Sequence, residues 1–288
     1  MPALYIVATP IGNLEDISLR ALRVLREVKL IAAEDTRKTK RLLIKYDIKT
    51  PMTSYHEHNK LTKLDYILSH LEDGDIALVS EAGTPGMSDP GYELIVAANQ
   101  RGIPVIPIPG PSAVITALVI SGLPTDRFTY IGFLPNRAPA RQRALEAVTN
   151  EYGTIVALES PHRLLATLND ILLILGDRKV AVCRELTKLY EEVFRGTISQ
   201  AIKHFVKPRG EFTLVIEGKR EKNKPELTEG IERQLHYMYL SGSTAKEAIA
   251  RISGETGLSR KELYRAWLKL DKVWDIENDS CQSFERSQ

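Results

Sequence analysis

Val79-Ser-Glu-Ala-Gly-Thr-Pro-Gly-Met-Ser-Asp-Pro-Gly91 is the stretch around which this chain is organised. It follows an apolar run at 76–79 that is typical of a buried strand, and it precedes a helix expected over 92–100. Its glycines tolerate a positive φ and let the backbone approach a ligand, while its two prolines fix the path of the loop. This composition favours a binding loop, and the alternative is a long loop rich in turn formers without a ligand.

Strands and helices alternate on both sides of this loop. Further strands are expected at 4–7, 29–33 and 103–106, and helices at 17–28, 36–46, 62–71 and 113–121. This order is typical of an open, mainly parallel α/β sheet. After a break at 122–126, a smaller α/β half with a mixed sheet is expected, with strands at 128–133, 154–158, 180–183, 192–195 and 212–217 and helices at 141–149, 162–175 and 198–205.

The sequence therefore predicts four parts. Residues 1–121 form an N-terminal α/β domain, 122–220 a second α/β domain, 221–272 a helical domain that is a candidate for RNA binding, and 273–288 a disordered tail without periodicity. The length of 288 residues suits about two main domains, and the net charge of +2 permits a nucleic-acid partner without requiring one.

Several classes of protein are not supported. Cys183 lies in an apolar run and is expected to be a core thiol, Cys281 lies in the tail, and neither belongs to a CxxC motif, so no disulfide framework or zinc ribbon is predicted. His56 and His58 lack a third ligand, and no metal is expected. Residues 1–7 lack the basic region of a signal peptide and no apolar run approaches about 20 residues, so we expect a cytoplasmic protein that does not enter a membrane.

Three turns rich in glycine and proline follow predicted parallel strands: 9–13, 80–91 and 107–112. Parallel strands end at one edge of a sheet, which is where ligands bind in this class of fold. None of the turns matches GxGxxG or GxxxxGK[ST], and none provides a phosphate-binding lysine. The turns therefore suit a nucleoside-like ligand without a polyphosphate.

Ordered motifs along residues 3–220 resemble the tetrapyrrole methylase superfamily, and within it the branch of small-subunit rRNA (cytidine-2′-O) methyltransferases. They are TPIGNLED at 9–16, AEDTR at 33–37, SEAGTP at 80–85 with SDPG at 88–91, PGPS at 109–112, GFLP at 132–135, ESPHR at 159–163, RELTK at 184–188 and GEFTLVIEG at 210–218. About nine motifs in order are more specific than one glycine-rich loop.

The resemblance implies two α/β domains with S-adenosyl-L-methionine bound in the cleft between them, and a homodimer. The cofactor contacts that it implies are Ile11, Thr84, Met87, Ser112, Ala113, Leu158, Leu186 and Thr213, with Gly83 and Pro85 shaping the same loop. Family members commonly have Asp where this chain has Glu81, so no role is carried over to Glu81.

Methyl transfer to a ribose hydroxyl needs positioning and gains from a base. Asp35 ends a predicted strand at the ligand edge and is a candidate base, with Arg37 holding a phosphate; the alternative is that Asp35 caps the following helix. His56 is a second catalytic candidate, and an ordinary loop histidine is the alternative.

Basic residues gather in three places. The helix expected at 36–46 supplies the RNA-binding candidates Arg37, Lys38 and Arg41, and Arg137, Arg141 and Arg143 form a second cluster. In the helical end, two short helices capped by Thr244 and Ser259 resemble a helix-turn-helix, and Arg260, Lys261 and Arg265 are RNA-binding candidates. Solvated helix faces are the alternative for all three.

The sequence thus favours an S-adenosyl-L-methionine-dependent 2′-O-methyltransferase acting on a cytidine of 16S rRNA, with the rRNA or the small ribosomal subunit as partner. One alternative is a superfamily methyltransferase that acts on a tetrapyrrole or a protein side chain. Another is a noncatalytic RNA-binding assembly factor that keeps the cofactor fold.

Overall fold

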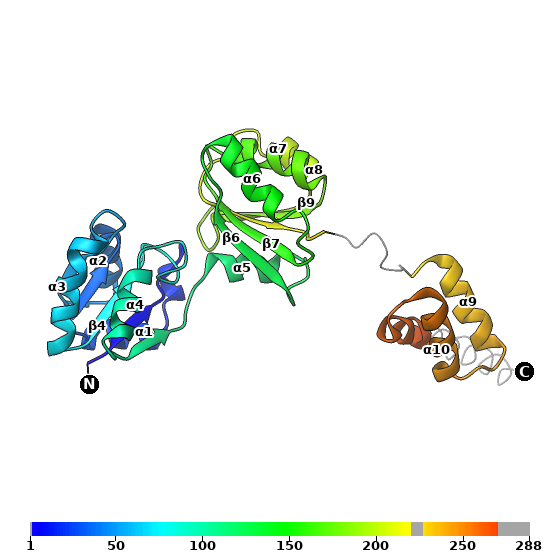
Figure 1. Cartoon of the computed structure of the whole chain (residues 1–288), viewed down its shortest axis with the longest axis horizontal. Coiled ribbons are helices and arrows are strands. Elements are labelled where there is room, and N and C mark those ends of the chain that lie inside the picture. The colour runs from blue at the N-terminus through cyan, green and yellow to red at the C-terminus, as the bar shows by residue number, and fades with distance from the viewer. Residues whose placement is uncertain (1, 220–226, 270–288) are drawn as a thin grey trace, which may run out of the picture. The chain divides into compact units, whose positions relative to one another are not determined.

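The computed structural model describes residues 2–219 and 227–269, which fall into two compact units (Figure 1). The first unit ends at Lys219 and contains both predicted α/β halves; the second contains the predicted helical end. Residues 220–226, at the start of the expected helical domain, and the whole expected tail with Cys281 lie outside the described residues.

The first sheet has five parallel strands in the order β3-β2-β4-β1-β5, which confirms the predicted open parallel sheet. Its strands are β1 (Leu4–Val7), β2 (Leu30–Ala33), β3 (Met52–Ser54), β4 (Ile76–Val79) and β5 (Val105–Ile108). The sequence did not predict β3, which has only three residues, and it placed β5 two residues early because prolines interrupt the run. β4 lies at the centre, so the organising loop leaves the middle of the sheet.

Helices cover both faces of this sheet. α1 (Leu19–Glu27) and α2 (Thr36–Lys45) pack on one face, and α3 (Lys60–Asp73) and α4 (Tyr92–Gln100) pack on the other. A 3-10 helix, Leu14–Asp16, precedes α1. Ser18 begins α1 by accepting a hydrogen bond from the N–H of Ala21 at 3.1 Å, an ordinary N-cap. The amphipathic sequences of α1 and α2 therefore bury their apolar sides and leave their basic sides in solvent.

The second sheet is mixed, as predicted, with the order β6-β7-β10-β8-β9. β6 runs parallel to β7, and the remaining neighbours are antiparallel. The strands are β6 (Phe128–Phe133), β7 (Thr154–Glu159), β8 (Lys179–Arg184), β9 (Glu192–Thr197) and β10 (Phe212–Ile216). One face carries α6 (Ala138–Ala147), α7 (Leu164–Leu175) and α8 (Ile198–His204).

The other face of the second sheet is covered by α5 (Ala113–Ile120), which follows β5 of the first sheet (Figure 1). Val114, Ala117 and Leu118 are buried there among residues of β7, β8 and β10. The Nε of Arg195 on β9 donates to the carbonyl of Ile120 at 3.1 Å. The two sheets thus share a helix, and the turn between β5 and α5 connects them.

Arg141 and Asp170 form a buried ion pair between α6 and α7. Nη2 of Arg141 lies 2.6 Å from Oδ2 of Asp170, and Gln142 donates to Oδ1 at 2.9 Å. Arg141 is 5% exposed, so the predicted basic cluster of Arg137, Arg141 and Arg143 is wrong for its central member. The residues next to Arg141 in the sequence do not indicate that its partner, Asp170, lies on the following helix.

The second unit consists of α9 (Glu229–Leu240), α10 (Ala245–Thr256) and a helix at 260–269 around its own core. Thr244 and Glu247 form the predicted capping box, and Gly257 ends α10 with a φ of 73°. Ser259 accepts from the N–H of Glu262 at 3.2 Å and begins the last helix. The small helical domain that the sequence predicts is therefore confirmed. No helix in the described ranges is long and apolar enough to cross a membrane.

Candidate functional site

A cavity of about 420 Å³ lies where the ends of strands from both sheets of the first unit meet. That volume is in the range of small-molecule sites. Nine of the ten predicted cofactor-binding residues line it: Ile11, Gly83, Thr84, Met87, Ser112, Ala113, Leu158, Leu186 and Thr213. Pro85 is buried and does not line the cavity. The structure thus brings together nine predicted residues that are up to 202 positions apart in the sequence. Their contact with a cofactor stays a prediction.

Backbone hydrogen bonds hold the three turns to one another. The N–H of Thr9 donates to the carbonyl of Gly83 at 2.8 Å, and the N–H of Gly83 donates back at 3.0 Å. The hydroxyl of Thr84 donates to the carbonyl of Pro111 at 3.3 Å. Gly83 has a φ of 81°, which a residue with a side chain adopts only with strain. The turns after β1, β4 and β5 therefore form one surface at the carboxyl edge, as the sequence predicts.

Two further contacts join this edge to the second sheet. The hydroxyl oxygens of Ser88 and Tyr130 lie 2.7 Å apart, and the N–H of Asn13 donates to the hydroxyl of Thr187 at 3.0 Å. At Gly12 a Cβ atom would lie 2.5 Å from Cγ of Lys188, so only glycine fits there. These contacts join the two walls of the cavity to each other.

The charge of the cavity lining is entirely acidic. Among the described residues, five carboxylates line it and no lysine or arginine does: Glu34, Glu81, Asp89, Glu159 and Glu211. The other lining groups are mainly apolar side chains, hydroxyls and backbone. Such a site disfavours a polyphosphate. Glu34 and Asp89, which have no cation partner among the described residues, favour a positively charged ligand, because opposite charges attract strongly where little water screens them.

Four of the five carboxylates have strong donors. Oε1 of Glu159 lies 2.7 Å from Nη2 of Arg163, and Oε2 of Glu211 lies 2.8 Å from Nζ of Lys188. Glu81 pairs with the ammonium group of Lys38, and Oε2 of Glu34 accepts from the N–H of Glu81 at 2.9 Å. These groups are held as structural acceptors.

Asp89 is the exception. Within the part of the chain that the structure describes, no ion pair joins it to a basic side chain, and the nearby hydroxyl of Ser80, which itself donates to the carbonyl of Gly83 at 3.1 Å, is the group that lowers its pKa. Burial, followed by the nearby charge of Glu34, raises the pKa of Asp89 to about 7, against the weaker lowering effect of Ser80. A carboxyl with this pKa exchanges a proton readily near neutral pH.

The two predicted catalytic residues do not line the cavity. Oδ1 of Asp35 accepts from the N–H groups of Arg37 at 2.8 Å and Lys38 at 3.2 Å, so Asp35 caps α2. The hydrogen bond from Lys38 is the largest influence on the pKa of Asp35, which lies below its ordinary value. Nδ1 of His56 is buried in the loop after β3 without a hydrogen-bond partner among the described residues.

The predicted RNA-binding residues form one exposed surface on each of the two units. Arg37, Lys38 and Arg41 are exposed on α2, although Lys38 is bound to Glu81. Arg260, Lys261 and Arg265 are exposed on the last helix, and none of them has an ion-pair partner in the described ranges. Each surface has solvent-facing cations, as backbone binding to RNA requires.

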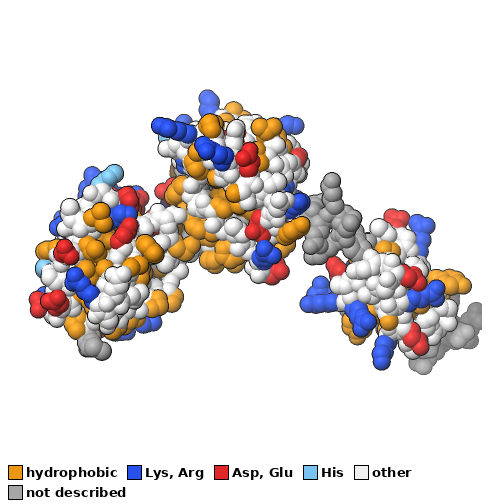
Figure 2. All heavy atoms as spheres, viewed as in Figure 1, with side chains coloured by type: hydrophobic (Ala, Val, Ile, Leu, Met, Phe, Trp, Pro, Cys, Tyr) orange, Lys and Arg blue, Asp and Glu red, His pale blue; other side chains and the backbone are white. Residues whose placement is uncertain are grey.

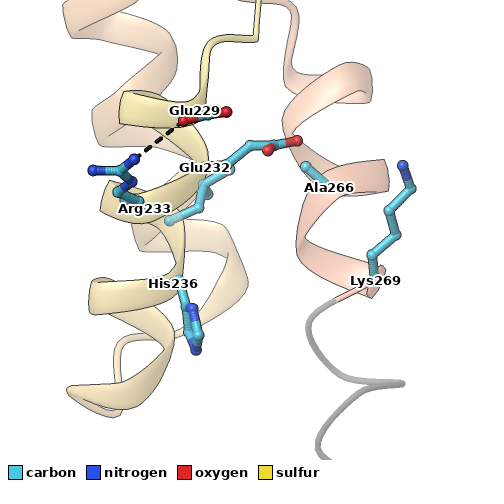
Figure 3. A pocket seen from close by; sticks show the side chains of 7 residues that line it. Glu229, Glu232, Arg233, His236, Ala266 and Lys269 are labelled. Atoms are coloured by element: carbon cyan, nitrogen blue, oxygen red, sulfur yellow. Dashed lines mark hydrogen bonds and ion pairs between the residues drawn. The ribbon is translucent and has the colours of Figure 1, made fainter.

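A second cavity of about 380 Å³ lies in the helical unit between α9 and the helix at 260–269 (Figure 3). Its labelled side chains carry both signs, and Arg233 is paired with Glu229 at 3.1 Å (Figure 3). This mixture suits a packing groove with a hydrated rim more than a site for phosphate. The described residues contain no group of three or more His, Cys, Asp or Glu side chains that could hold a metal.

Sequence reasoning missed Asp89, Tyr130 and Glu34 as members of the site. The signal for Asp89 was available, since it lies inside the organising loop between Ser88 and Pro90. Tyr130 gave none, because an aromatic residue in a strand is usually core. Glu34 directly precedes Asp35. Which of these two carboxylates lines the cavity depends on the directions of their side chains, which the sequence does not give.

Comparison with known proteins gives a consistent result. Residues 3–202 match the family described as Tetrapyrrole (Corrin/Porphyrin) Methylases. A relative from Halalkalibacterium halodurans named Ribosomal RNA small subunit methyltransferase I is 50% identical over 273 residues, which cover 92% of this chain and 94% of that protein. A relative of the same name from Thermotoga maritima is 52% identical over 222 residues, which cover 76% of this chain and 100% of that protein.

Among solved structures, a uroporphyrin-III C-methyltransferase from Thermus thermophilus in complex with S-adenosylhomocysteine is similar, with a TM-score of 0.54 and 19% identity. The match covers 75% of this chain and 97% of that one. At this identity the likeness shows the fold of the two sheets alone.

Proposed function

We propose, from the premise that this chain belongs to the tetrapyrrole (corrin/porphyrin) methylase family, that it is an S-adenosyl-L-methionine-dependent methyltransferase of the ribose 2′-oxygen of a cytidine in 16S rRNA. The observation that carries the proposal is the acidic cavity between the two sheets, in a chain half identical to a protein named Ribosomal RNA small subunit methyltransferase I.

The residues of the cavity fit this cofactor. The close backbone approach at Gly83 and the apolar side chains of Ile11, Met87 and Leu158 suit a nucleoside, and the acidic lining suits a ligand with a sulfonium and an ammonium group. When bound, the cofactor supplies an electrophilic methyl carbon. The chain's own residues hold the reactants in line and exclude water, which is the larger part of such catalysis.

The RNA is proposed to bind along α1 and α2. Residues 17–50 contain ten basic and four acidic residues, a net charge of +6, whereas the whole chain has +2, so the rest of the chain carries −4. α1 and α2 share one face of the sheet, and Nη2 of Arg26 donates to the carbonyl of Tyr46 at 3.0 Å. Arg20 and Arg23 thereby extend the basic surface of α2, the electrostatic footprint expected for nucleic-acid binding.

We also propose a homodimer that acts in the cytoplasm, where ribosomal RNA is processed. The outer side of α5 exposes Ile115 and Val119, which are 47% and 63% exposed. Hydrophobic side chains gather over the surface where α5 lies (Figure 2). A second copy of the chain would bury this apolar surface, as is common in obligate interfaces.

The test is to map ribose methylation. Small ribosomal subunits and naked 16S rRNA are incubated with the purified chain and labelled S-adenosyl-L-methionine, and the RNA is digested for mass spectrometry. We expect label in one 2′-O-methylcytidine. Label in a tetrapyrrole or a protein instead would support the other members of the family, and cofactor binding without transfer to any of them would support an assembly factor.

A further inference from the structure

We infer that the carboxylate of Asp89 is the base that accepts the proton of the methyl-accepting hydroxyl. This inference rests on the proposed function and names a residue for its proton transfer. It starts from the cavity, where Asp89 lies within the same loop as Gly83, Thr84 and Met87.

Three of the five carboxylates that line the cavity are already held by cations. Glu159 and Glu211 are neutralised by Arg163 and Lys188, and a carboxylate bound to a cation is a weak base. Glu81 is likewise paired, with Lys38. Each of these would have to break an ion pair before it took a proton.

Glu34 and Asp89 remain. Glu34 already accepts from the N–H of Glu81, and this bond would be weakened by protonation. Asp89 has no cation partner among the described residues, and the nearby hydroxyl of Ser80 already donates to the carbonyl of Gly83 at 3.1 Å, so protonation of Asp89 breaks no ion pair. Asp89 therefore gains a proton at a smaller cost than any other lining carboxylate.

The surroundings of Asp89 set its affinity for protons. Glu34 from the end of β2 and Glu81 from its own loop place negative charge nearby, and Tyr130 faces it from β6. Burial and the two glutamates raise the pKa of Asp89 to about 7. Lys38 offsets part of the charge of Glu81. A base with such a pKa is ionised in part at cellular pH and still binds a proton firmly, the balance that favours general-base catalysis.

The step balances with the groups named. Asp89 removes the proton of the 2′-hydroxyl while that oxygen forms its bond to the methyl carbon. The bond from the carbon to sulfur breaks, and its electron pair stays on sulfur. Asp89 then returns the proton to solvent, and no further reactant is needed.

The test compares wild type, Asp89→Asn, Asp89→Glu and Glu34→Gln in single-turnover methylation of ribosomal substrate from about pH 5.5 to about pH 9. Wild type should gain rate through one ionisation near pH 7. The methylation rate of Asp89→Asn should be lower by about 100-fold or more, and its pH profile should lack the step near pH 7. Asp89→Glu should recover part of the rate. Glu34→Gln should keep the step and move it to lower pH, because a neighbouring negative charge has been removed.

Two measurements without turnover complete the test. Binding of S-adenosylhomocysteine by calorimetry should stay within about threefold in Asp89→Asn; a loss above about tenfold would make Asp89 a cofactor ligand and overturn the inference. In urea unfolding, the half-buried carboxyl should make wild type lose stability relative to Asp89→Asn as pH rises through about 7, since a raised pKa favours the protonated folded chain.

The outcomes separate the two proposals. Equal rates in wild type and Asp89→Asn, or the same pH step in both, would overturn the base and leave the methyltransferase intact. A wild type that binds S-adenosylhomocysteine but methylates no 16S rRNA would contradict the proposed function, and the base would fall with it. Circular dichroism shows whether each variant has folded. If Asp89→Asn does not fold, the rate and the pH profile of Asp89→Glu test whether Asp89 is the base.

Discussion

The hydroxyl oxygens of Ser88 and Tyr130 lie 2.7 Å apart, so that the loop after β4 in the first sheet is hydrogen-bonded to β6 in the second. Ser88 holds a φ of 66°, a conformation that costs free energy in a residue with a side chain. The bond fixes the loop that also contains Thr84, Met87 and Asp89. It therefore ties the loop after β4 to the opposite wall of the cavity.

We expect Tyr130→Phe to weaken S-adenosylhomocysteine binding by roughly fivefold, because a neutral hydrogen bond contributes about 1 kcal/mol. Calorimetry measures the effect, and Tyr152→Phe, at a half-exposed tyrosine, is the matched control. The double variant with Ser88→Ala should bind no more weakly than the weaker single variant. Fully additive losses would show that the two hydroxyls act independently.

The buried pair of Arg141 and Asp170 predicts a large effect on stability. Arg141→Met leaves the carboxylate of Asp170 buried without its cation, and such a loss costs about 3–5 kcal/mol. Urea unfolding of the full chain measures it. The control is Arg23→Met, which breaks an exposed pair with Glu27 and should cost less than about 1 kcal/mol. Equal costs in the two variants would contradict the burial argument.

Local signals predicted most of this fold. The apolar run before Val79 and the turn formers after it determined the central strand and the ligand edge, and Thr244 with Glu247 determined the start of α10. These features depend on neighbours within a few residues. The central strand, the ligand edge and the start of α10 could therefore be predicted without knowledge of the tertiary structure.

What the sequence could not show depends on distant partners. Lys38 was expected to face RNA, yet Glu81, 43 residues away, takes its ammonium group. Asp35 and Asp89 both follow strands at the ligand edge, but only the fold decides that Asp35 turns back to cap α2 while Asp89 faces the cavity. The same physical chemistry applies to both carboxylates, and the side-chain direction separates their roles.

For Asp35 we expect the cap to dominate. Asp35→Ala should lower stability by about 0.5–2 kcal/mol near pH 7, and Asp35→Asn, which keeps an acceptor, by much less. The pKa of Asp35 is lowered in the folded chain, so its contribution is present above the unfolded pKa and is lost as pH falls through the folded one. Urea midpoints at about pH 7 and about pH 3.5 should show the difference between wild type and Asp35→Ala shrinking.

Turnover distinguishes the cap from the catalytic alternative for Asp35. We expect Asp35→Asn to methylate ribosomal substrate at close to the wild-type rate, since its carboxylate does not line the cavity. A loss of about 100-fold with normal folding and normal cofactor binding would instead restore Asp35 as the base.

The basic surface of α1 and α2 predicts a change in salt dependence. Replacing Arg20, Arg37 and Arg41 with alanine should weaken RNA binding, and the slope of log affinity against log salt should flatten by about 0.7 to 0.9 for each phosphate that no longer binds a cation of the protein. Fluorescence anisotropy at several salt concentrations measures the slope. Arg101, exposed near the opposite end of the strands, is the control site, and an equal effect per cation there would indicate non-specific attraction.

The helical unit offers a sharper test, because it packs around its own core and can be removed. We expect a chain ended after Lys224 to bind S-adenosylhomocysteine normally, since all residues that line the cavity precede that point. Methylation of the ribosomal substrate should fall sharply if Arg260, Lys261 and Arg265 hold rRNA phosphates.

The fall should appear in kcat/KM more than in kcat, because cations that bind the RNA backbone and do not line the cavity act on substrate binding and leave the transfer step unchanged. Rates at saturating and limiting RNA separate the two constants. Replacing those three cations with alanine in the full chain should reproduce the loss. This variant separates the effect of removing their charges from the effect of removing the whole helical unit. A shortened chain that matches the full one at limiting RNA would show that the helical unit has no part in binding the substrate.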